Sequence, residues 1–315
     1  MKILLLGANG QLGRALAQTQ SLAALGQVVL ASRDGLFAGE AQALPVDMEQ
    51  GHQLEGLLDQ VHPDVIINAA AYTAVDRAEQ EEDLATRING DALSVIGHWA
   101  ARKQALVVHY STDYVFDGTK RTPYKVADAP NPIGAYGRSK LAGEQALTAS
   151  GAPYYIFRTA WLYSACGHNF LRTMLSLAKQ RSELSVVNDQ YGSPTTAKLV
   201  AQGSLMAVEQ WLRASRKEAP PLLGTYHLVS SGLTTWHDFA VAVFERASAA
   251  GLLQSVPQVI AVGTRDYPTP ARRPAWSVLD NDDFSRRFGF LLPNWQVGLS
   301  DTINELSVKA NGLTC

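Results

Sequence analysis

Tyr136 and Lys140 stand four positions apart at the start of a segment whose apolar residues have helical spacing. Residues at this separation share one face of a helix, with their Cβ atoms about 5–6 Å apart. A phenol has a pKa of about 10, and a neighbouring ammonium group lowers it. We therefore expect this pair to transfer a proton to or from an alcohol or sugar oxygen, with Lys140 lowering the pKa of Tyr136.

Thr112 adds a third group to this pair. The apolar run from Ala105 to Val108 leads into small hydroxyl residues, which is typical of a buried parallel strand that ends at a cleft. From that position Thr112 is expected to hydrogen-bond the same substrate oxygen as Tyr136. A tyrosine and a lysine four apart often occur by chance, as an ordinary surface pair. Together with Thr112, however, the pattern favours a catalytic set of Thr112, Tyr136 and Lys140.

A glycine-rich turn lies near the start of the chain. Residues 2–6 are continuously apolar, which predicts a central parallel strand, and Gly7, Gly10 and Gly13 follow it before a helical pattern. In such a motif the first glycine permits the tight turn, the second lets the backbone approach a pyrophosphate, and the third lets helix and strand pack closely. The turn therefore predicts a dinucleotide site, rather than a glycine-rich turn without a ligand.

The residues after the second expected strand, 27–31, bear on the choice of coenzyme. NAD sites place an acidic residue there to hold the ribose, whereas this chain has Ser32 and Arg33. A guanidinium group suits a 2′-phosphate, so we expect NADPH, with NADH as the alternative. Arg33 as a mere exposed loop charge is the competing interpretation. Asp47 and Met48 follow the next apolar stretch and are expected near the adenine.

The alternation of strands and helices predicts an α/β fold with a Rossmann-type doubly wound parallel sheet. The alternation fades after the expected strand at 154–159, which suggests a smaller C-terminal α/β substrate-binding lobe. We expect residues 1–165, with roughly 195–232 returning to them, to form an NADP(H)-binding domain. Residues 166–194 and 233–315 are expected to form the substrate-binding lobe. Asn89, polar within a helical pattern, is expected to be structural.

Composition narrows the class of protein. The 315 residues carry a net charge of −2 without a basic run, so no nucleic-acid partner is expected. The apolar run before Gly7 is too short for a signal peptide or a membrane span. Cys166 and Cys315 make no disulfide framework and fit a reducing compartment. We expect a cytoplasmic protein with no membrane partner.

Four runs, together with these motifs, resemble a known family. They are NAAAYTAVD at 68–76, HYSTDYVF at 109–116, NDQYGSPT at 188–195 and TTWHDFA at 234–240. The glycine turn and the Thr112, Tyr136 and Lys140 set are similar to those of extended short-chain dehydrogenase/reductases. Within that superfamily the four runs resemble the dTDP-4-dehydrorhamnose reductases, and the resemblance covers nearly the whole chain.

The resemblance implies an oxidoreductase of dTDP-rhamnose biosynthesis. It would reduce the C4 keto group of dTDP-4-dehydro-6-deoxy-L-mannose with NADPH, giving dTDP-L-rhamnose for cell-surface polysaccharide. Tyr136 would donate the proton, and Lys140 would hold the nicotinamide ribose. Besides the glycine turn, Ser32 and Arg33, the implied cofactor residues are Gln11, Leu12, Asp47, Met48, Ala71, Tyr72, Thr73, Tyr110, Tyr136 and Lys140. The implied substrate residues are Thr112, Asp113, Trp161, Asn169, Gln190 and Arg273.

Two other functions are compatible with this scaffold. One is another nucleotide-sugar 4-ketoreductase, epimerase or dehydratase, and the other is a non-catalytic NADP-binding regulatory subunit. Ser32 and Arg33 argue against a tightly held NAD, and Thr112 has no acidic pair beside it. The complete Thr112, Tyr136 and Lys140 set argues against a regulatory subunit. The sequence leaves open the stereochemistry of the sugar and a complex with a preceding epimerase.

The chain departs from the resembled family at one site. Some of those reductases are dimers bridged by Mg²⁺, held by a glutamate just after the third glycine and by another at the start of a later helix. Here these positions hold Arg14-Ala15 and Ala197-Lys198. A hard cation needs anionic oxygens, which these side chains lack. We therefore expect no Mg²⁺ there, and a monomer or a metal-independent homodimer.

Overall fold

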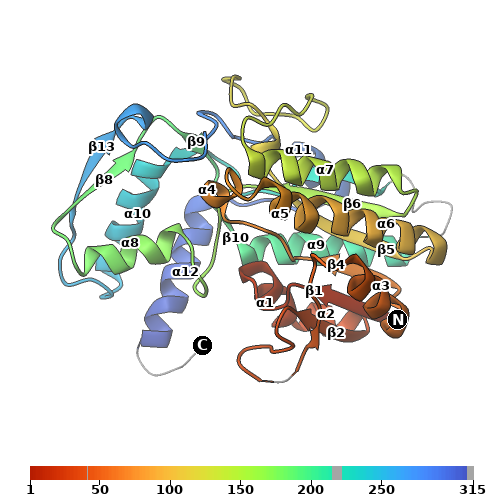
Figure 1. Ribbon diagram of the computed structural model, residues 1–315. Helices are drawn as coiled ribbons and strands as arrows, with labels where there is room; N and C mark the ends of the chain where they lie inside the picture. Colours follow the sequence, from red (N-terminus) through yellow and green to blue (C-terminus); the bar gives the residue numbers. More distant parts are fainter. Residues whose placement is uncertain (41, 215–221, 311–315) are drawn as a thin grey trace.

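The computed structural model describes residues 1–40, 42–214 and 222–310. A seven-stranded sheet organises its larger part, on the right in Figure 1. Every pair of neighbouring strands in it is parallel. The spatial order is β11 (Gly224–His227), β6 (Tyr154–Thr159), β5 (Leu106–Thr112), β4 (Val65–Asn68), β1 (Lys2–Leu6), β2 (Gln27–Ser32) and β3 (Leu44–Pro45). This order confirms the predicted Rossmann-type sheet.

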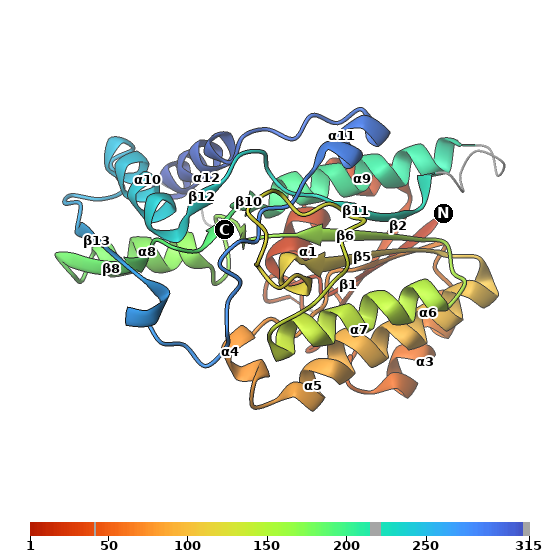
Figure 2. The same cartoon turned by 90° about the horizontal axis from the view of Figure 1, so that it is seen from above.

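Helices cover both faces of the sheet (Figure 2). One face is packed by α3 (Gly51–Val61), α6 (Ala92–Lys103) and α7 (Ala135–Ala149), and the other by α1 (Gln11–Ala17), α2 (Gln20–Leu25) and α9 (Ala197–Arg213). In β1, Ile3 and Leu5 point into one core, while Leu4 and Leu6 point into the other. A strand covered on both sides needs apolar residues at every position, which explains why β1 shows no alternation.

Shorter elements lead from the sheet to the site. α4 (Val75–Ala78), α5 (Glu82–Thr86) and the π-helical turn η1 (Arg87–Asp91) follow β4, and the 3₁₀ turn η2 (Asp113–Val115) follows β5. Asn89 in η1 is buried and accepts a hydrogen bond from the backbone N–H of Tyr72 at 2.9 Å. Its amide nitrogen donates to the Ser139 hydroxyl on α7 at 3.0 Å. These bonds join η1 to α7 and agree with a structural role for Asn89.

A second group of elements packs beside the carboxyl ends of the strands. It contains α8 (Phe170–Ala178), α10 (Trp236–Ala249), α12 (Trp295–Ala310) and the parallel strands β8 (Glu183–Val187) and β13 (Gln258–Val262). Two short pairs border it: β7 (Leu162–Tyr163) with β10 (Thr195–Thr196), and β9 (Tyr191–Gly192) with β12 (Thr234–Thr235). The helices and β8 share a core of their own, built around Phe239 and Leu299.

One segment of the expected substrate lobe packs elsewhere. The helix α11 (Asp282–Phe288) lies against α9 and β11, and its Phe284 and Phe288 belong to the core of the large sheet. Two buried phenylalanines thus hold this helix of the expected lobe against the sheet. The division into 1–165 with roughly 195–232, and 166–194 with 233–315, remains a prediction.

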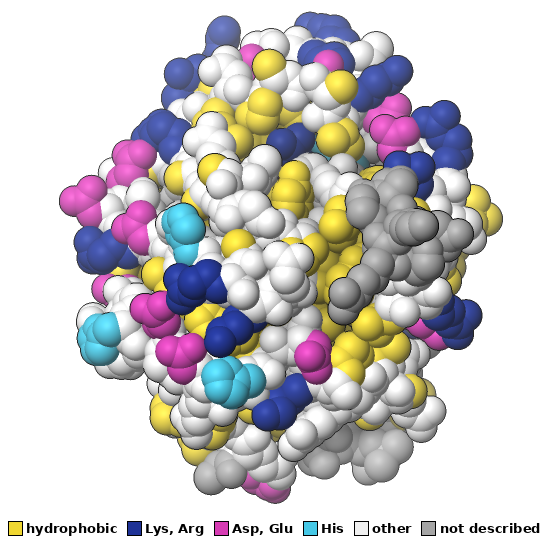
Figure 3. Space-filling model, turned by 90° about the vertical axis from the view of Figure 1, so that its right-hand side faces the viewer, with side chains coloured by type: hydrophobic (Ala, Val, Ile, Leu, Met, Phe, Trp, Pro, Cys, Tyr) yellow, Lys and Arg dark blue, Asp and Glu magenta, His cyan; other side chains and the backbone are white. Residues whose placement is uncertain are grey.

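The surface agrees with the balanced composition. On the face drawn in Figure 3, acidic and basic side chains are interspersed among polar and apolar ones. Within 1–40, 42–214 and 222–310, no helix has the length and apolar character needed to span a bilayer.

Candidate active site

The carboxyl ends of the central strands open onto a cleft of about 770 Å³ between the sheet and the C-terminal helices. Ligands of open parallel sheets bind at this edge. The structure brings most of the predicted site residues together in its wall. They are Gly10, Gln11, Leu12, Ala71, Thr73, Tyr110, Thr112, Asp113, Tyr136, Lys140, Trp161, Asn169 and Arg273.

The remaining predicted residues do not line this cleft. Gly7 and Gly13 lie within the glycine turn, and Tyr72 donates its hydroxyl to Glu81 at 2.6 Å. Ser32, Arg33, Asp47 and Met48 lie at or just beyond the carboxyl ends of β2 and β3, where Arg33 is exposed. Gln190 is buried, and its amide nitrogen donates to the Thr264 hydroxyl at 3.1 Å. Its place at the nucleotide end remains a prediction.

The glycine turn is packed too tightly for side chains at two of its three positions. Gly7 has a φ of +75°, and a Cβ there would lie 2.5 Å from the backbone nitrogen of Ala70. A Cβ on Gly13 would lie 2.1 Å from the carbonyl oxygen of Gly7. Gly10 caps α1 without a side-chain hydrogen bond and lies in the cleft wall. The first backbone N–H groups of a helix have no partner within the helix, so this turn can receive an anionic group.

Thr112 and Asp113 come from the end of β5 and the start of η2. The Thr112 hydroxyl donates to Asp113 Oδ1 at 3.0 Å and accepts from the Tyr114 backbone N–H at 3.2 Å. Both residues are buried. Burial raises the pKa of Asp113 to about 6, against the opposing effect of its hydrogen bonds. Asp113 therefore changes charge just below neutral pH.

The pKa of Tyr136 corrects one prediction. Burial raises this pKa to about 12, the charge of Asp113 adds to the rise, and a hydrogen bond with Thr112 opposes it. The predicted lowering of this pKa is therefore wrong for this structure, because burial disfavours the phenolate and raises the pKa. A phenol with a raised pKa stays protonated at neutral pH, as a proton donor must.

Lys140 lies one helical turn beyond Tyr136 on α7 and is 2% exposed. Its Nζ lies 3.2 Å from Nε2 of His109 on β5. Burial lowers the pKa of Lys140 to about 8, opposed by the charge of Glu144. Glu144 in turn forms a buried ion pair with Arg158 on β6.

Four buried polar atoms in the cleft wall make no hydrogen bond within the part of the chain that the structure describes. They are the hydroxyls of Tyr110, Ser111 and Thr159 and Oδ2 of Asp113. Buried polar groups in native proteins nearly always have a partner. A ligand with several hydroxyl groups would supply the missing partners.

Two indole rings form another part of the wall. Trp161 and Trp236 stack with centroids 3.5 Å apart and an interplanar angle of 4°. Trp161 has a φ of +48°, and a Cβ on Gly192 would lie 2.4 Å from its ring. The rings present an apolar surface of the kind on which a sugar packs.

Arg273 and Asn169 reach the cleft with partners already in place. Arg273 Nη2 pairs with Asp76 Oδ2 at 2.9 Å. Asn169 caps α8 by accepting from the Arg172 backbone N–H, and its amide nitrogen donates to Gln11 Oε1 at 2.8 Å. Asn169 thereby joins the glycine turn to the C-terminal helices.

The sequence reasoning missed Trp236, Ser111 and Thr159. Trp236 stands inside the TTWHDFA run and begins α10, where Thr235 caps the helix. Ser111 directly precedes Thr112, and Thr159 ends β6 as Thr112 ends β5. The signal for both hydroxyls was therefore their place at strand ends.

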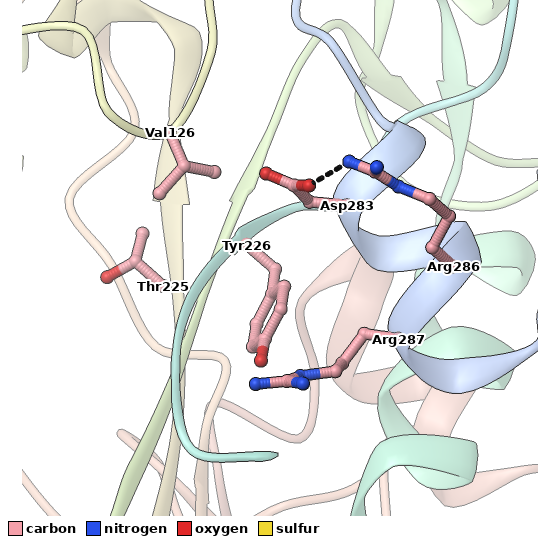
Figure 4. A pocket seen from close by; sticks show the side chains of 6 residues that line it. All are labelled: Val126, Thr225, Tyr226, Asp283, Arg286 and Arg287. Atoms are coloured by element: carbon pink, nitrogen blue, oxygen red, sulfur yellow. Dashed lines mark hydrogen bonds and ion pairs between the residues drawn. The ribbon is translucent and has the colours of Figure 1, made fainter. Parts of the chain in front are cut away.

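A second hollow, of about 460 Å³, contains none of the predicted site residues (Figure 4). It lies at the start of β11, away from the carboxyl edge, and Asp283 in its wall pairs with Arg286 at 2.5 Å. It is lined by Val126, Thr225, Tyr226, Asp283, Arg286 and Arg287. Nothing in its wall resembles a catalytic set.

Comparison with known proteins finds similarity over nearly the whole chain. Residues 1–308 match the family described as RmlD substrate binding domain. A dTDP-4-dehydrorhamnose reductase of Burkholderia thailandensis is 44% identical over 308 residues, covering 97% of this chain and 99% of the relative.

Solved structures agree. A dTDP-4-dehydrorhamnose reductase of Clostridium acetobutylicum has a TM-score of 0.84 at 35% identity, covering 97% of this chain and 99% of that one. One from Bacillus anthracis, solved in complex with NADP, has a TM-score of 0.78 at 33% identity, covering 96% and 99%. The chain therefore belongs to the RmlD substrate-binding-domain family, the family of the dTDP-4-dehydrorhamnose reductases.

Proposed function

We propose that this chain is a dTDP-4-dehydrorhamnose reductase. It reduces the C4 keto group of dTDP-4-dehydro-6-deoxy-L-mannose with NADPH and yields dTDP-L-rhamnose. The observation that carries the proposal is the arrangement in the cleft wall. The protonated phenol of Tyr136 stands beside the unpartnered polar atoms of Ser111, Asp113 and Thr159. The names of the relatives support the same reaction.

The coenzyme would bind along the glycine turn. The tight packing at Gly7 and Gly13 and the bare backbone at Gly10 suit a pyrophosphate. When bound, NADPH supplies the hydride. Ala71, Thr73 and Tyr110 line the cleft next to this turn, and Lys140 would hold the nicotinamide ribose. Arg33, exposed beyond the end of β2, would hold the 2′-phosphate.

The substrate would lie between the strand ends and the two indole rings. Tyr136 gives its proton to the C4 oxygen as that oxygen takes up negative charge. Thr112 and Asp113 hold the sugar hydroxyls, and Trp161 packs against the ring. Arg273, already oriented by Asp76, faces the same cleft and would bind the diphosphate of dTDP.

We also propose a monomer or a metal-independent homodimer. Arg14 and Lys198 line a surface hollow of about 330 Å³ beside α1, and Glu305 is the one carboxylate among its lining residues. One carboxylate among two cations is a poor site for Mg²⁺. Light scattering with and without EDTA tests this, with no change in mass expected. Dissociation on chelation, reversed by Mg²⁺, would overturn it.

The proposed reaction has a direct assay. Purified protein, NADPH and enzymatically generated dTDP-4-keto sugar are mixed, the loss of NADPH absorbance is followed, and the product is identified by NMR. We expect stoichiometric oxidation of NADPH and formation of dTDP-L-rhamnose. A C4 epimer of rhamnose would indicate a different ketoreductase. Turnover of the sugar without net NADPH loss would indicate an epimerase, and binding without turnover a regulatory subunit.

A further inference from the structure

Behind the cleft wall, the side chains of Asn68, His109 and Lys140 form a buried chain. Lys140 Nζ lies 3.2 Å from His109 Nε2, and His109 Nδ1 lies 3.3 Å from the amide nitrogen of Asn68. Asn68 and His109 face each other on the neighbouring strands β4 and β5. None of the three is more than 2% exposed, so these contacts are shielded from bulk solvent.

The direction of these hydrogen bonds is fixed at Asn68. Its Oδ1 accepts a hydrogen bond from the backbone N–H of Ala70 at 3.1 Å. The amide nitrogen therefore points at His109, and an amide nitrogen only donates. His109 Nδ1 must accept, so in a neutral ring the proton is on Nε2. Turning the Asn68 amide would leave the Ala70 N–H buried opposite another donor, which is costly.

Lys140 consequently faces an N–H group. An ammonium group has three donors and no acceptor, whereas a neutral amine has a lone pair that can accept from His109 Nε2–H. Burial holds the pKa of His109 well below its usual range, with the charge of Lys140 acting in the same direction, so the ring is neutral. Burial also lowers the pKa of Lys140 itself.

We infer that Asn68 and His109 are positioning residues that select the Nε2–H tautomer and thereby favour the uncharged form of Lys140. Under the proposed function, on which this consequence rests, Lys140 lies one turn from the phenol that loses its proton in each cycle. A lysine poised in this way gains and loses a proton near neutral pH, whereas an ordinary lysine stays charged.

Other ionisable groups surround Lys140 and enter the same balance. On α7 these are Tyr136 and Glu144, the latter neutralised by Arg158 on β6. On η2, Asp113 acts on Tyr136. Of these, Glu144 favours the charged form of Lys140. Burial and the tautomer of His109 both oppose this effect and favour the uncharged form.

The tautomer can be observed directly. Long-range ¹H–¹⁵N correlation NMR on ¹⁵N-histidine protein distinguishes Nδ1–H from Nε2–H, and the His109 signals are assigned by their loss in His109→Gln. We expect the Nε2–H tautomer in the wild-type protein from pH 6 to 9. The measurement needs neither NADPH nor substrate, so it is independent of the proposed reaction. The Nδ1–H tautomer or an imidazolium in the wild type would overturn the inference.

Asn68→Asp tests the coupling to Lys140. A carboxylate of the same shape still accepts from the Ala70 N–H, but it also accepts from Nδ1–H, so the ring proton moves and Nε2 becomes an acceptor for an ammonium group. We expect the titration of Lys140, followed by ¹³C NMR of its ε-carbon and assigned with Lys140→Met, to rise by about one pH unit or more.

The matched control is Asn294→Asp. The Asn294 side chain accepts from the Gln296 backbone N–H, as an aspartate would, and it lies outside the cleft wall. This variant should leave the Lys140 titration in place. An Asn68→Asp protein whose Lys140 titrates as in the wild type would overturn the inference. If that variant does not fold, the NMR measurement of the His109 tautomer in the wild-type protein still tests the inference.

Discussion

Two buried side chains on successive turns of α7, Lys140 and Glu144, differ in whether an opposite charge lies beside them. Glu144 is 4% exposed, and Arg158 donates to it through Nε at 2.9 Å and Nη2 at 2.6 Å. Lys140 is equally buried, yet its nearest partner is the neutral ring of His109. The first charge is compensated, whereas the second is not. A buried group without a compensating charge has a shifted pKa, and groups with shifted pKa values are concentrated at functional sites.

Other polar groups in the cleft wall resemble Lys140, because they too are buried without a compensating partner. Tyr136 and Asp113 are buried without an opposite charge, and burial raises the pKa of both. Ser111 and Thr159 hold hydroxyls without partners among the described residues. We conclude that the ion pair of Glu144 and Arg158 maintains the fold and that the unpaired groups of Tyr136, Lys140 and Asp113 are available for chemistry.

Tyr136→Phe should have the largest effect, because it removes the proton donor and nothing that binds the coenzyme. We expect turnover to fall about 10²–10⁴-fold. NADPH affinity, measured by fluorescence titration, should stay within a few-fold of wild type. Tyr154→Phe, on a partly buried tyrosine outside the cleft wall, is the control. Tyr136→Phe turnover within a few-fold of wild type would remove Tyr136 from the mechanism.

Glu144→Gln should destabilise the fold. Removing one partner leaves the Arg158 guanidinium buried and unpaired, and the expected loss is about 3–5 kcal/mol in the free energy of unfolding. Glu82→Gln is a matched control. Glu82 also pairs with an arginine, Arg138 of α7, at 2.7 Å, but both of these side chains are exposed. Its loss should be about 0–1 kcal/mol. Urea unfolding measures both, and equal losses would contradict the comparison.

Asp113→Asn should raise stability at pH 7. The folded pKa of Asp113 is about 6, above the value of about 4 in an unfolded chain. Between these values the folded state binds more protons, so wild-type stability falls as pH rises, by ~3 kcal/mol in all. Urea unfolding at pH 4, 5, 6 and 7 should show this fall in the wild type and not in the variant. A variant less stable than wild type at pH 7 would contradict the assignment.

Arg33→Asp should have a small and selective effect. A carboxylate in place of the guanidinium would repel a 2′-phosphate, so NADPH affinity should fall on the order of tenfold, ~1.4 kcal/mol. NADH affinity should rise or stay level, and stability should not change because Arg33 is exposed. Isothermal titration with each coenzyme measures this. Equal losses for both coenzymes would make Arg33 a general surface charge.

Much of the fold could be predicted because its signals are local. The uninterrupted apolar run of β1, the spacing of the glycines and the four-residue step from Tyr136 to Lys140 each lie within one element. These predicted the sheet, the turn and one wall of the cleft. The resemblance to a family supplied further residues of the wall, among them Trp161, Asn169 and Arg273, but not Ser111, Thr159 or Trp236.

The features that the sequence did not predict depend on contacts between distant segments of the chain. The sequence places Asn68 and His109 on different strands, and only their register brings them together behind Lys140. Trp161 and Trp236, which stack on each other, are even farther apart in the sequence. The direction of the Tyr136 pKa shift was wrong because burial is a property of the assembled cleft, and the local pattern showed only the neighbouring lysine.

The comparison on α7 is tested most directly by measuring Lys140→Met and Glu144→Gln side by side, for kcat, NADPH affinity and free energy of unfolding. Because the folded pKa of Lys140, about 8, lies below its unfolded value, the unfolded state binds more protons between pH 8 and about 10. Wild-type stability should therefore rise across this range, and the rise should be absent in Lys140→Met.

At pH 7 we predict that Lys140→Met loses turnover and NADPH affinity while its stability is kept or increased. Glu144→Gln should lose stability, and the folded enzyme should keep far more turnover than Lys140→Met. The opposite pattern, a destabilised but active Lys140→Met and a stable but inactive Glu144→Gln, would contradict the account.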